Sequence, residues 1–387
     1  MGERTTSLEG VRRANLGEVL RLVHHEGPRS RAMLTAETGL NRSTVSDLVT
    51  ALTGAGLVEE RDPDPTRRVG RPSPIVAPRE DVVAIAVNPE VDALEVGAVA
   101  LGGRVGERVR EEARGVVDVD DVVAAVARIV RSWRAGALRG ARIVGIGVAV
   151  PGLVRAADGM VRLAPHLEWR ETDISGRLGA ATGLPVAVGN DASLAARAER
   201  LFGAARDHGD IVYLNGGASG IGGGVIMRGM TMGGADGYAG EWGQSRPSVP
   251  HAADRRVPHG VLEDEVNRAR LLAVAGLDAV DDETLARALA TSDDPAVEAE
   301  IERQRRVLAA TLANAINVLN PSVIVLGGFL ATLHERDPSG LLGAVRAQAL
   351  AAPAERVEIR AAALGADRLL IGAAEAAFEP LLADPLA

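Results

Sequence analysis

The sequence predicts a small helical domain at the N-terminus and a larger α/β body after it, and three observations lead to this prediction. Apolar residues recur with helical spacing between residues 11 and 52. From residue 82 onward, β-branched runs alternate with glycine turns and further helical patterns. Between them lies "RRVGRPSPIVAPR", a segment rich in proline and arginine that is typical of a linker. We therefore expect a head at 1–66, a basic linker at 67–79 and a body at 80–387.

Composition excludes several classes of protein. The 387 residues contain no cysteine, which excludes disulfides, thiolate nucleophiles and cysteine zinc sites. All 43 basic residues are arginine, so a kinase that depends on a P-loop lysine is excluded as well. No run approaches the roughly 18 apolar residues of a membrane helix, and the polar start "MGERTTSLEG" has no signal-peptide core. We expect a cytoplasmic protein without membrane contact.

Charge is distributed unevenly along the chain. Residues 1–79 hold 12 arginines against 10 acidic residues, whereas residues 80–387 hold 31 against 42. A mildly basic head on an acidic body is typical of a DNA-binding module joined to another domain. The acidic stretch at 277–303 is expected to form a solvated helical surface.

The head shows three helical patterns in succession. The first covers 11–25, and its apolar positions follow the i, i+3, i+4, i+7 spacing of one helix face. Ser30 is placed to cap the second helix, Gly39 supplies a turn, and Asn41 is a good N-cap for the third. Glycines 54 and 56 end the third helix, and "LVEER" then predicts the first strand of a β-wing.

The third helix is divided in the way a DNA recognition helix requires. An apolar back packs on the module, while small polar side chains enter the major groove. The buried positions are Val45, Leu48, Val49 and Leu52, and the polar face carries Arg42, Ser43, Thr44 and Ser46. After the wing, Arg67, Arg68 and Arg71 are placed to reach a phosphate or a narrow minor groove. The alternative is a small solvent-facing three-helix domain, but the whole string favours a winged helix-turn-helix.

The body opens with three strands joined by hairpins, then a helix and a fourth strand. The strands are expected at 82–87, 93–101, 105–109 and 143–150, and the helix is expected to start at Asp120 or Asp121. This order is the opening of an actin-like or ribonuclease-H-like lobe. A second series starts near "DIVYL" at 210–214 and includes a long helix around 301–319, strands at 322–328 and 357–362, and a closing helix near 368–378. We expect a two-lobed body with the actin-like ATPase fold.

The chain resembles the ROK family (repressor, open reading frame, kinase), and within it the winged-helix repressors of sugar metabolism. The resemblance spans roughly residues 12–380 and rests on six blocks in order. The blocks are "GIGVAVPGLV" (145–154), "LPVAVGNDASLAA" (184–196), "GIGGG" (220–224), "GGADGYAGEWGQ" (233–244), "GVLEDEV" (260–266) and "LNPSVIVLGG" (319–328).

Two phosphate loops distinguish the kinases that the chain resembles. The first is an Asp-x-Gly-Gly-Thr turn, but here Asn88, Pro89 and Glu90 occupy it. Proline removes an N–H donor and a carboxylate repels phosphate. The second loop, "GASGIGGG" at 217–224, is retained with Ser219 in place of threonine. We interpret it as an inherited tight hairpin rather than a phosphate cradle, and we expect no catalytic residue.

The sugar-contacting side of the family is better retained. The resemblance places the family's catalytic aspartate at Asp191, after Asn190, and an amide beside a carboxylate can also bind vicinal hydroxyls without catalysis. The alternative for either residue is an N-cap of the helix that follows. The expected ligand-binding residues are Gly152, His166, Asn190, Asp191, Glu241, Gln244 and Glu263.

Three departures from the family pattern concern this site. Gln244 replaces a histidine that contacts sugar and binds zinc in relatives, and His166 replaces an asparagine. The three zinc cysteines are absent from the segment "HAADRRVPHGVLE", where His251, Asp254 and His259 offer only a weak alternative metal site. We therefore expect no metal and no cofactor.

These observations predict a ligand-responsive transcriptional regulator, most simply a repressor. It would bind double-stranded operator DNA as a homodimer or a dimer of dimers and sense a sugar or sugar derivative in the body. Two alternatives remain at this stage. One is a ROK sugar kinase with a fused DNA-binding head, and the other is a constitutive DNA-binding protein whose body only dimerises.

Overall fold

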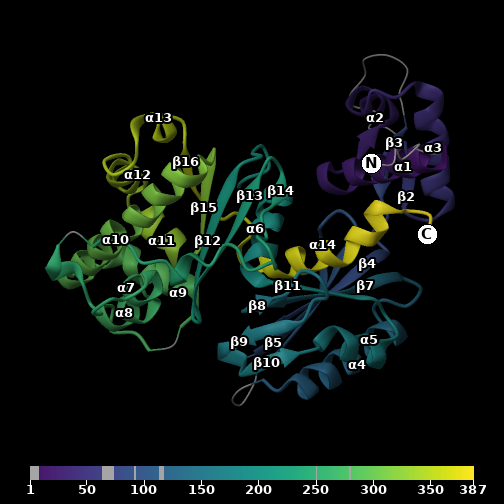
Figure 1. Cartoon of the computed structure of the whole chain (residues 1–387). Coiled ribbons are helices and arrows are strands. Elements are labelled where there is room, and N and C mark those ends of the chain that lie inside the picture. Colours follow the sequence, from purple (N-terminus) through teal and green to yellow (C-terminus); the bar gives the residue numbers. More distant parts are fainter. Residues whose placement is uncertain (1–7, 63–73, 91–92, 113–116, 250, 279) are drawn as a thin grey trace. The chain divides into compact units, whose positions relative to one another are not determined.

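The computed structural model describes residues 8–62, 74–90, 93–112, 117–249, 251–278 and 280–387. The chain divides into two compact units, each considered by itself (Figure 1). Unit 1 comprises residues 1–148, 173–188 and 373–387, and unit 2 comprises residues 149–172 and 189–372. Among the described residues, no helix has the length and apolar composition needed to cross a membrane.

The head forms the three helices and the wing that the sequence predicts. Ser30 accepts a hydrogen bond from the Met33 N–H at 3.1 Å and caps the second helix. Asn41 accepts one from the Thr44 N–H at 2.8 Å and caps the third, so both expected caps are confirmed. The elements are α1 (Leu8–Glu26), β1 (Arg29–Ser30), α2 (Arg31–Thr38), α3 (Arg42–Gly54), β2 (Val58–Arg61) and β3 (Ile75–Pro78).

Strand β3 comes from the segment expected to be a linker. It pairs antiparallel with β2, from Val58 opposite Pro78 to Arg61 opposite Ile75, and also with β1. The strand contains Ile75 and Val76, which favour β-structure, although prolines lie close by in the sequence. Pro78 is tolerated because it stands at the end of the strand, where no ladder N–H is needed. The head domain therefore extends to at least residue 78 in the described chain.

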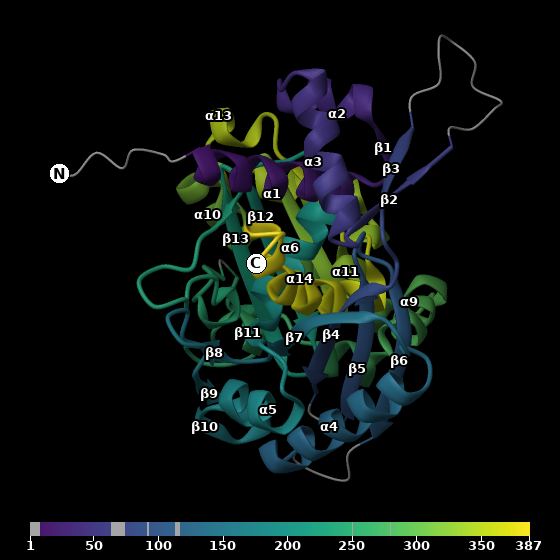
Figure 2. The same cartoon turned by 90° about the vertical axis from the view of Figure 1, so that its right-hand side faces the viewer.

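The first lobe contains the predicted strand–helix series. Its sheet has the order β11-β7-β4-β5-β6, in which β4 pairs antiparallel with β5 and parallel with β7. Helices α4 and α5 lie side by side along it (Figures 1 and 2). Asp118, rather than Asp120 or Asp121, caps α4, because its side chain accepts the Asp120 N–H at 2.8 Å. The elements are β4 (Val82–Pro89), β5 (Ala93–Ala100), β6 (Val105–Glu112), α4 (Val119–Ala135), β7 (Arg142–Val150), α5 (Ile174–Thr182) and β11 (Val186–Asn190).

Unit 2 is built on a second sheet with the same kind of strand order, β14-β13-β12-β15-β16. Counted along the chain, the strands of both sheets run 3-2-1-4-5, which confirms the expectation of two similar lobes. Alternate residues of β12 face opposite sides, as Tyr213 packs with α6 and Leu214 packs with α10 and α11. The sheet strands are β12 (Ile211–Gly217), β13 (Gly220–Met227), β14 (Met230–Thr231), β15 (Val323–Gly328) and β16 (Glu358–Ala361).

Helices cover both faces of this second sheet, with α6 on one face and α10 and α11 on the other (Figure 1). A small antiparallel sheet of β8 (Leu153–Val154), β9 (Val161–Ala164) and β10 (Trp169–Thr172) also belongs to unit 2. The helices are α6 (Asp191–Phe202), α7 (Leu262–Glu265), α8 (Arg268–Val274), α9 (Asp282–Thr291), α10 (Pro295–Leu319), α11 (Phe329–Arg336), α12 (Pro338–Arg346), α13 (Ala351–Ala354) and α14 (Arg368–Ala383).

The acidic stretch at 277–303 is helical, and one face of it is the solvated surface that its charge suggested, while the opposite face is buried. It contains α9 and the start of α10, whose residues Leu285, Leu289, Val297 and Ile301 are buried in the main core of unit 2. Arg303 at its end is also buried. The stretch is therefore amphipathic, and net charge along a segment does not by itself reveal which residues form the buried face.

Candidate functional site

The third helix of the head presents the polar face expected of a recognition helix. Val45 and Val49 are fully buried, whereas Arg42 and Ser43 are exposed. Arg42 has no hydrogen bond or ion pair with any residue that the structure describes, so its guanidinium is available to DNA. Ser43 donates to Asn41 at 2.7 Å, and its oxygen stays at the exposed start of α3.

Ser46 has a structural contact that the sequence did not reveal. Its hydroxyl accepts a hydrogen bond from Arg31 at 2.7 Å, and Arg31 also forms a bidentate ion pair with Glu60 of β2 at 2.6 and 2.7 Å. The Arg31 side chain thus ties α2, α3 and the wing together. Thr44 is partly buried. The expected DNA contacts Arg67, Arg68 and Arg71 lie outside the described residues.

The head is anchored within unit 1 by a buried cluster of His24, His25 and Glu375. The Nε2 atoms of His24 and His25 lie 2.6 and 3.2 Å from the two carboxylate oxygens of Glu375 on α14. The backbone N–H of Gly102 donates to Nδ1 of His24 at 2.6 Å. Nδ1 is therefore unprotonated, and the ring proton lies on Nε2, facing the carboxylate.

The three ligand-type atoms of this cluster converge closely enough to suggest a metal site. A metal bound at Nε2 would, however, leave the proton on Nδ1, where it would oppose the Gly102 N–H. The cluster therefore fits an anchor and not a metal centre. Burial opposes ionisation of Glu375, but the two histidines outweigh it and hold its pKa below the ordinary value.

In unit 2, Asn190 is the N-cap of α6, which confirms one of the two roles that were considered for it. Its side-chain oxygen accepts the Ser193 N–H at 2.9 Å and caps α6, while its Nδ2 donates to the Gly152 carbonyl at 3.0 Å. Gly152 has no room for a side chain, because an added Cβ would lie 2.7 Å from Cα of Ala164. The structure thus joins these two expected residues at the start of α6.

Asp191 is the first residue of α6 and its carboxylate is held in place. It accepts the hydrogen bond of the Ala192 N–H at 2.8 Å. Burial, together with the nearby charge of Glu241, raises the pKa of Asp191 to about 6, although Arg368 opposes this shift. Arg368 lies 177 positions away along the chain, and no sequence pattern linked it to this aspartate.

Glu263 is the most firmly held carboxylate of the expected site. One oxygen accepts the Ile221 N–H at 3.1 Å, and the other accepts Nε2 of Gln244 at 2.6 Å. Glu241 is close enough to Glu263 to feel its charge. Burial, and then this charge, raise the pKa of Glu241. The structure therefore brings Asp191, Glu241, Gln244 and Glu263 into one polar region of unit 2, in which carboxylates and an amide can bind sugar hydroxyls.

His166 is not joined to this group. It lies exposed in a 3-10 turn, Pro165–Leu167, and no described hydrogen bond or ion pair connects it to the other expected ligand residues. Its assignment as a ligand residue rests on the family resemblance alone.

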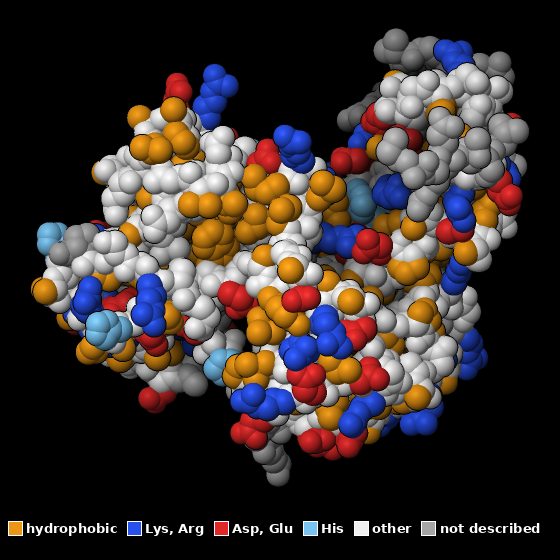
Figure 3. Space-filling model, viewed as in Figure 1, with side chains coloured by type: hydrophobic (Ala, Val, Ile, Leu, Met, Phe, Trp, Pro, Cys, Tyr) orange, Lys and Arg blue, Asp and Glu red, His pale blue; other side chains and the backbone are white. Residues whose placement is uncertain are grey.

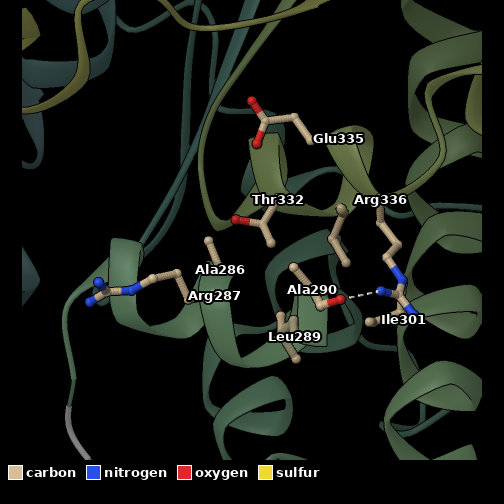
Figure 4. Close-up of a pocket in the computed structure, with 9 residues that line it drawn as sticks. Ala286, Arg287, Leu289, Ala290, Ile301, Thr332, Glu335 and Arg336 are labelled. Atoms are coloured by element: carbon tan, nitrogen blue, oxygen red, sulfur yellow. Dashed lines mark hydrogen bonds between the residues drawn. The ribbon is translucent and has the colours of Figure 1, made fainter. Parts of the chain in front are cut away.

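A separate cavity of about 280 Å³ opens between α9, α10 and α11. None of the expected sugar-binding residues lines it, and its wall includes Leu289, Ile301 and Leu333. Arg336 at its edge donates to the carbonyl of Ala290 at 2.9 Å (Figure 4). The cavity is therefore distinct from the polar region around Glu263.

The turn after β4, which the resemblance compares with the first phosphate loop of the kinases, carries the carboxylate of Glu90. Strand β4 continues through Pro89, and the buried Asn88 donates to Glu90 at 2.9 Å. Burial raises the pKa of Glu95 on β5, and Glu90 adds to the shift. Glu90 also pairs with Arg110 at 2.6 Å.

The second glycine-rich stretch is a tight hairpin. Strands β12 and β13 pair up to Gly217 opposite Gly220, so only Ala218 and Ser219 form the turn. Neighbouring groups approach the glycines at 222–224 of β13 closely. An added Cβ at Gly224 would lie 2.8 Å from Cβ of Ala196 on α6, and one at Gly223 would overlap the Trp242 ring.

Comparison with known proteins agrees with this geometry. A model of the ROK family matches residues 98–379, and a model of the IclR helix-turn-helix domain matches residues 14–62. A putative xylose repressor of Caldicellulosiruptor sp. (strain Rt8B.4) is 24% identical over 338 residues, which cover 82% of this chain and 83% of the relative.

A glucokinase of Halalkalibacterium halodurans is 27% identical over 247 residues, covering 59% of this chain and 74% of the enzyme. Among solved structures, a ROK family transcriptional regulator, a homologue of the E. coli Mlc protein, matches with a TM-score of 0.77 at 25% identity. That match covers 97% of this chain and 98% of the regulator.

Proposed function

The chain belongs to the ROK family, and from this premise we propose that it is a sugar-responsive transcriptional repressor. The observation that carries the proposal is one chain holding both a capped recognition helix with an exposed polar face and a polar, carboxylate-rich region in unit 2. Its relatives named as xylose repressors and its likeness to a ROK regulator over nearly the whole chain support the same function.

The proposed effector is a sugar or sugar derivative held by Asn190, Asp191, Glu241, Gln244 and Glu263. Ionised carboxylates accept hydroxyl hydrogens, and the amides supply both donors and acceptors. Repression responds to sugar only if the sugar binds the DNA-competent and DNA-incompetent states with different affinities. A coupling free energy of about 1–3 kcal/mol is typical of such systems.

The DNA-binding surface is proposed to comprise Arg42, Ser43 and Thr44 of α3, with the basic residues beyond the wing. A palindromic operator read by two heads would suit a homodimer. On the face shown in Figure 3, acidic and basic side chains of the described body are interspersed.

Operator binding with and without sugar tests the proposal. Genome-wide footprinting of the purified protein would supply the operator, and fluorescence anisotropy would then report its affinity with D-xylose, D-glucose and N-acetylglucosamine. We expect one sugar of the panel to change the affinity at least about fivefold. Asp191→Ala should abolish this change and leave sugar-free DNA binding near normal. No sugar effect in the native protein would contradict the proposal.

Arg42→Ala tests the DNA face separately. Loss of one contact should weaken operator binding and, if the contact is to phosphate, reduce the salt slope by about one unit. Arg61→Ala is the control, since Arg61 is also exposed but pairs with Glu59 at the wing. An unchanged operator affinity and salt slope in Arg42→Ala would remove Arg42 from the interface.

A sugar kinase is the second candidate, because Asp191 has a pKa of about 6, which suits a general base, and glucokinases are among the relatives. The carboxylates at the β4–β5 turn argue against it. Sugar-dependent ADP release that disappears in Asp191→Ala would favour the kinase. Absence of ATP turnover would favour the sensor.

A further inference from the structure

The family resemblance implies a zinc ion near Gln244, yet the residues of segment 251–262 do not fit one. Cysteine is absent from the chain. The carboxylate of Asp254 is bound on both oxygens by Arg306, at 2.8 and 3.0 Å. In the described chain, neither His251 nor His259 belongs to any group of three ligand-type residues close enough to share a metal ion. The structure instead places a buried arginine against this segment.

That arginine is Arg303 on α10, which is 1% exposed and among the largest fully buried side chains. All five of its N–H donors have acceptors. Nε and Nη2 donate to the two oxygens of Glu300 at 2.8 and 2.7 Å. Nη1 donates to the Asp254 carbonyl at 2.8 Å and to the Glu265 carboxylate at 3.3 Å, and Nη2 also donates to the Glu265 carbonyl at 2.6 Å.

Arg303 and the groups that accept its hydrogen bonds form a cluster that we call the clamp. The carboxylate of Glu265 extends this clamp to the backbone of the segment. It accepts the backbone N–H groups of Arg256 and Val257 at 2.9–3.0 Å. Glu265 is itself 1% exposed. One buried cation thus joins α10 to the end of α7 and to the loop before it. A zinc ion joins ligands in the same way, through one charge at the centre.

The cluster is balanced in charge. Three arginines, 256, 303 and 306, stand against the carboxylates of Asp254, Glu265 and Glu300. Burial opposes ionisation of Glu300, but hydrogen bonds from Arg303 and Gln304 hold its pKa below the ordinary value. Removal of one partner from such a group leaves an uncompensated buried charge.

Glu263 shares the short helix α7 with Glu265, which the buried Arg303 contacts. Helix α7 has only four residues, and Glu263 is the second of them, two positions before Glu265. Helices this short have little stability of their own. The place of Glu263 against Gln244 and the Ile221 N–H therefore depends on how α7 is held from its other end.

We propose that Arg303, with Glu265 and Asp254, holds segment 251–262 in place of the zinc ion implied by the family, and is a positioning residue for Glu263. The structural half of this proposal stands without a sugar, and its link to sensing rests on the proposed function. Because arginine stays charged at all relevant pH values, this clamp needs neither metal nor deprotonation.

Hydrogen exchange of the full-length protein tests the clamp. Arg303→Lys keeps the charge but offers three donors for five acceptors. We expect the amides of Arg256 and Val257 to exchange about tenfold faster or more, a loss of about 1.4 kcal/mol of local protection. The matched control is Arg305→Lys on the same helix, since Arg305 is 4% exposed but contacts Glu302 and Asp337 instead. Exchange in 251–262 should be unchanged there.

Three results would overturn the proposal. One is unchanged exchange of these amides in Arg303→Lys, and another is an equal increase in Arg305→Lys. The third is a stoichiometric zinc ion in the purified native protein whose removal by EDTA speeds exchange in 251–262. If Arg303→Lys does not fold, the half-exposed Arg306 carries the test. Arg306→Gln should then speed exchange around residue 254 by a smaller factor, and no change there would count against the clamp.

A sugar measurement separates this inference from the proposed function. If D-xylose or another sugar of the panel changes operator affinity in the native protein, Arg303→Lys should weaken binding of that sugar while sugar-free operator binding persists. Unaltered sugar binding beside faster exchange would remove the positioning role of Arg303. If no sugar affects the native protein, the proposed function fails, whereas the exchange result still decides the clamp.

Discussion

The first hairpins of the two sheets invite comparison, because both occupy the same place in the same strand order. The described part of the β4–β5 hairpin reaches Pro89 and Glu90, and Glu90 contacts the side chains of Asn88 and Arg110. In the β12–β13 hairpin, Gly222, Gly223 and Gly224 each lie too close to α6 or to Trp242 to admit a side chain. The kinases that the chain resembles use both loops for phosphate.

The contrast separates glycines that packing requires from hairpin positions at which no glycine is required. A glycine that serves only phosphate can be replaced once phosphate is no longer bound. A glycine that also lets a helix and an indole ring approach the backbone cannot be replaced without repacking. Retained glycines in "GASGIGGG" are therefore weak evidence for nucleotide binding, whereas the carboxylates at the other hairpin are stronger evidence against it.

Among the substitutions that test this comparison, Gly223→Ala should lower the free energy of unfolding most. Its new methyl group would overlap the Trp242 ring and lie 2.7 Å from the Tyr213 carbonyl oxygen. We expect a loss of about 3 kcal/mol in the free energy of unfolding, at the upper end for overpacking. Urea denaturation followed by circular dichroism measures it. A loss under about 1 kcal/mol would show that packing does not explain the glycine.

Asp191→Asn, at the helix against which the second hairpin packs, should show a pH-dependent effect. The raised pKa of Asp191, about 6 against an ordinary 3.8, means that its ionised form is disfavoured in the fold. The native protein therefore loses stability as pH rises from 4 through 6. Relative to it, the variant should gain on the order of 2 kcal/mol between pH 4 and pH 7.5. Melting curves at these two pH values that shift in parallel would contradict this.

Replacing both Pro89 and Glu90 by glycine should have a smaller effect. The change removes the half-exposed Glu90–Arg110 ion pair and adds chain entropy to the unfolded state. Together these should cost about 1–1.5 kcal/mol in urea denaturation. A loss as large as that of Gly223→Ala would erase the contrast between the hairpins.

Ser219→Ala at the second turn should change stability by less than about 0.5 kcal/mol, because the residue lies in the turn and not in the packed strands. It serves as the control for Gly223→Ala in the same hairpin. If the two variants were equally destabilised, the turn itself and not the packing of the strands would account for both.

Much of the fold followed from local pattern. The caps at Ser30 and Asn41, the buried face of α3 and the first four strands of the body depend on residues within a few positions of one another. Such features can be read without knowing the tertiary structure. The strand at 75–78 could not, because proline and arginine around it suggested a linker and only pairing with β1 and β2 made it a strand.

The candidate site was predicted residue by residue but not as an arrangement. The resemblance identified Asp191, Glu241, Gln244 and Glu263, and the structure brings these four together. It does not join His166 to them, and it adds Arg368, which no motif indicated. Long-range charge pairs leave no periodic trace in the sequence, so they could not be predicted.

The sequence by itself determined the two-part organisation, the recognition helix, the residues Asn88, Pro89 and Glu90 after the first strand of the body, and the absence of cysteine ligands for zinc. Each of these is a property of residue type at a local spacing. The tertiary structure alone decided that Arg303, inside an acidic stretch, lies buried with all five donors satisfied. It also decided that Trp242 and α6 pack directly against glycines of the second hairpin. Burial depends on which distant elements pack on a residue, and that is settled only when the whole chain has folded.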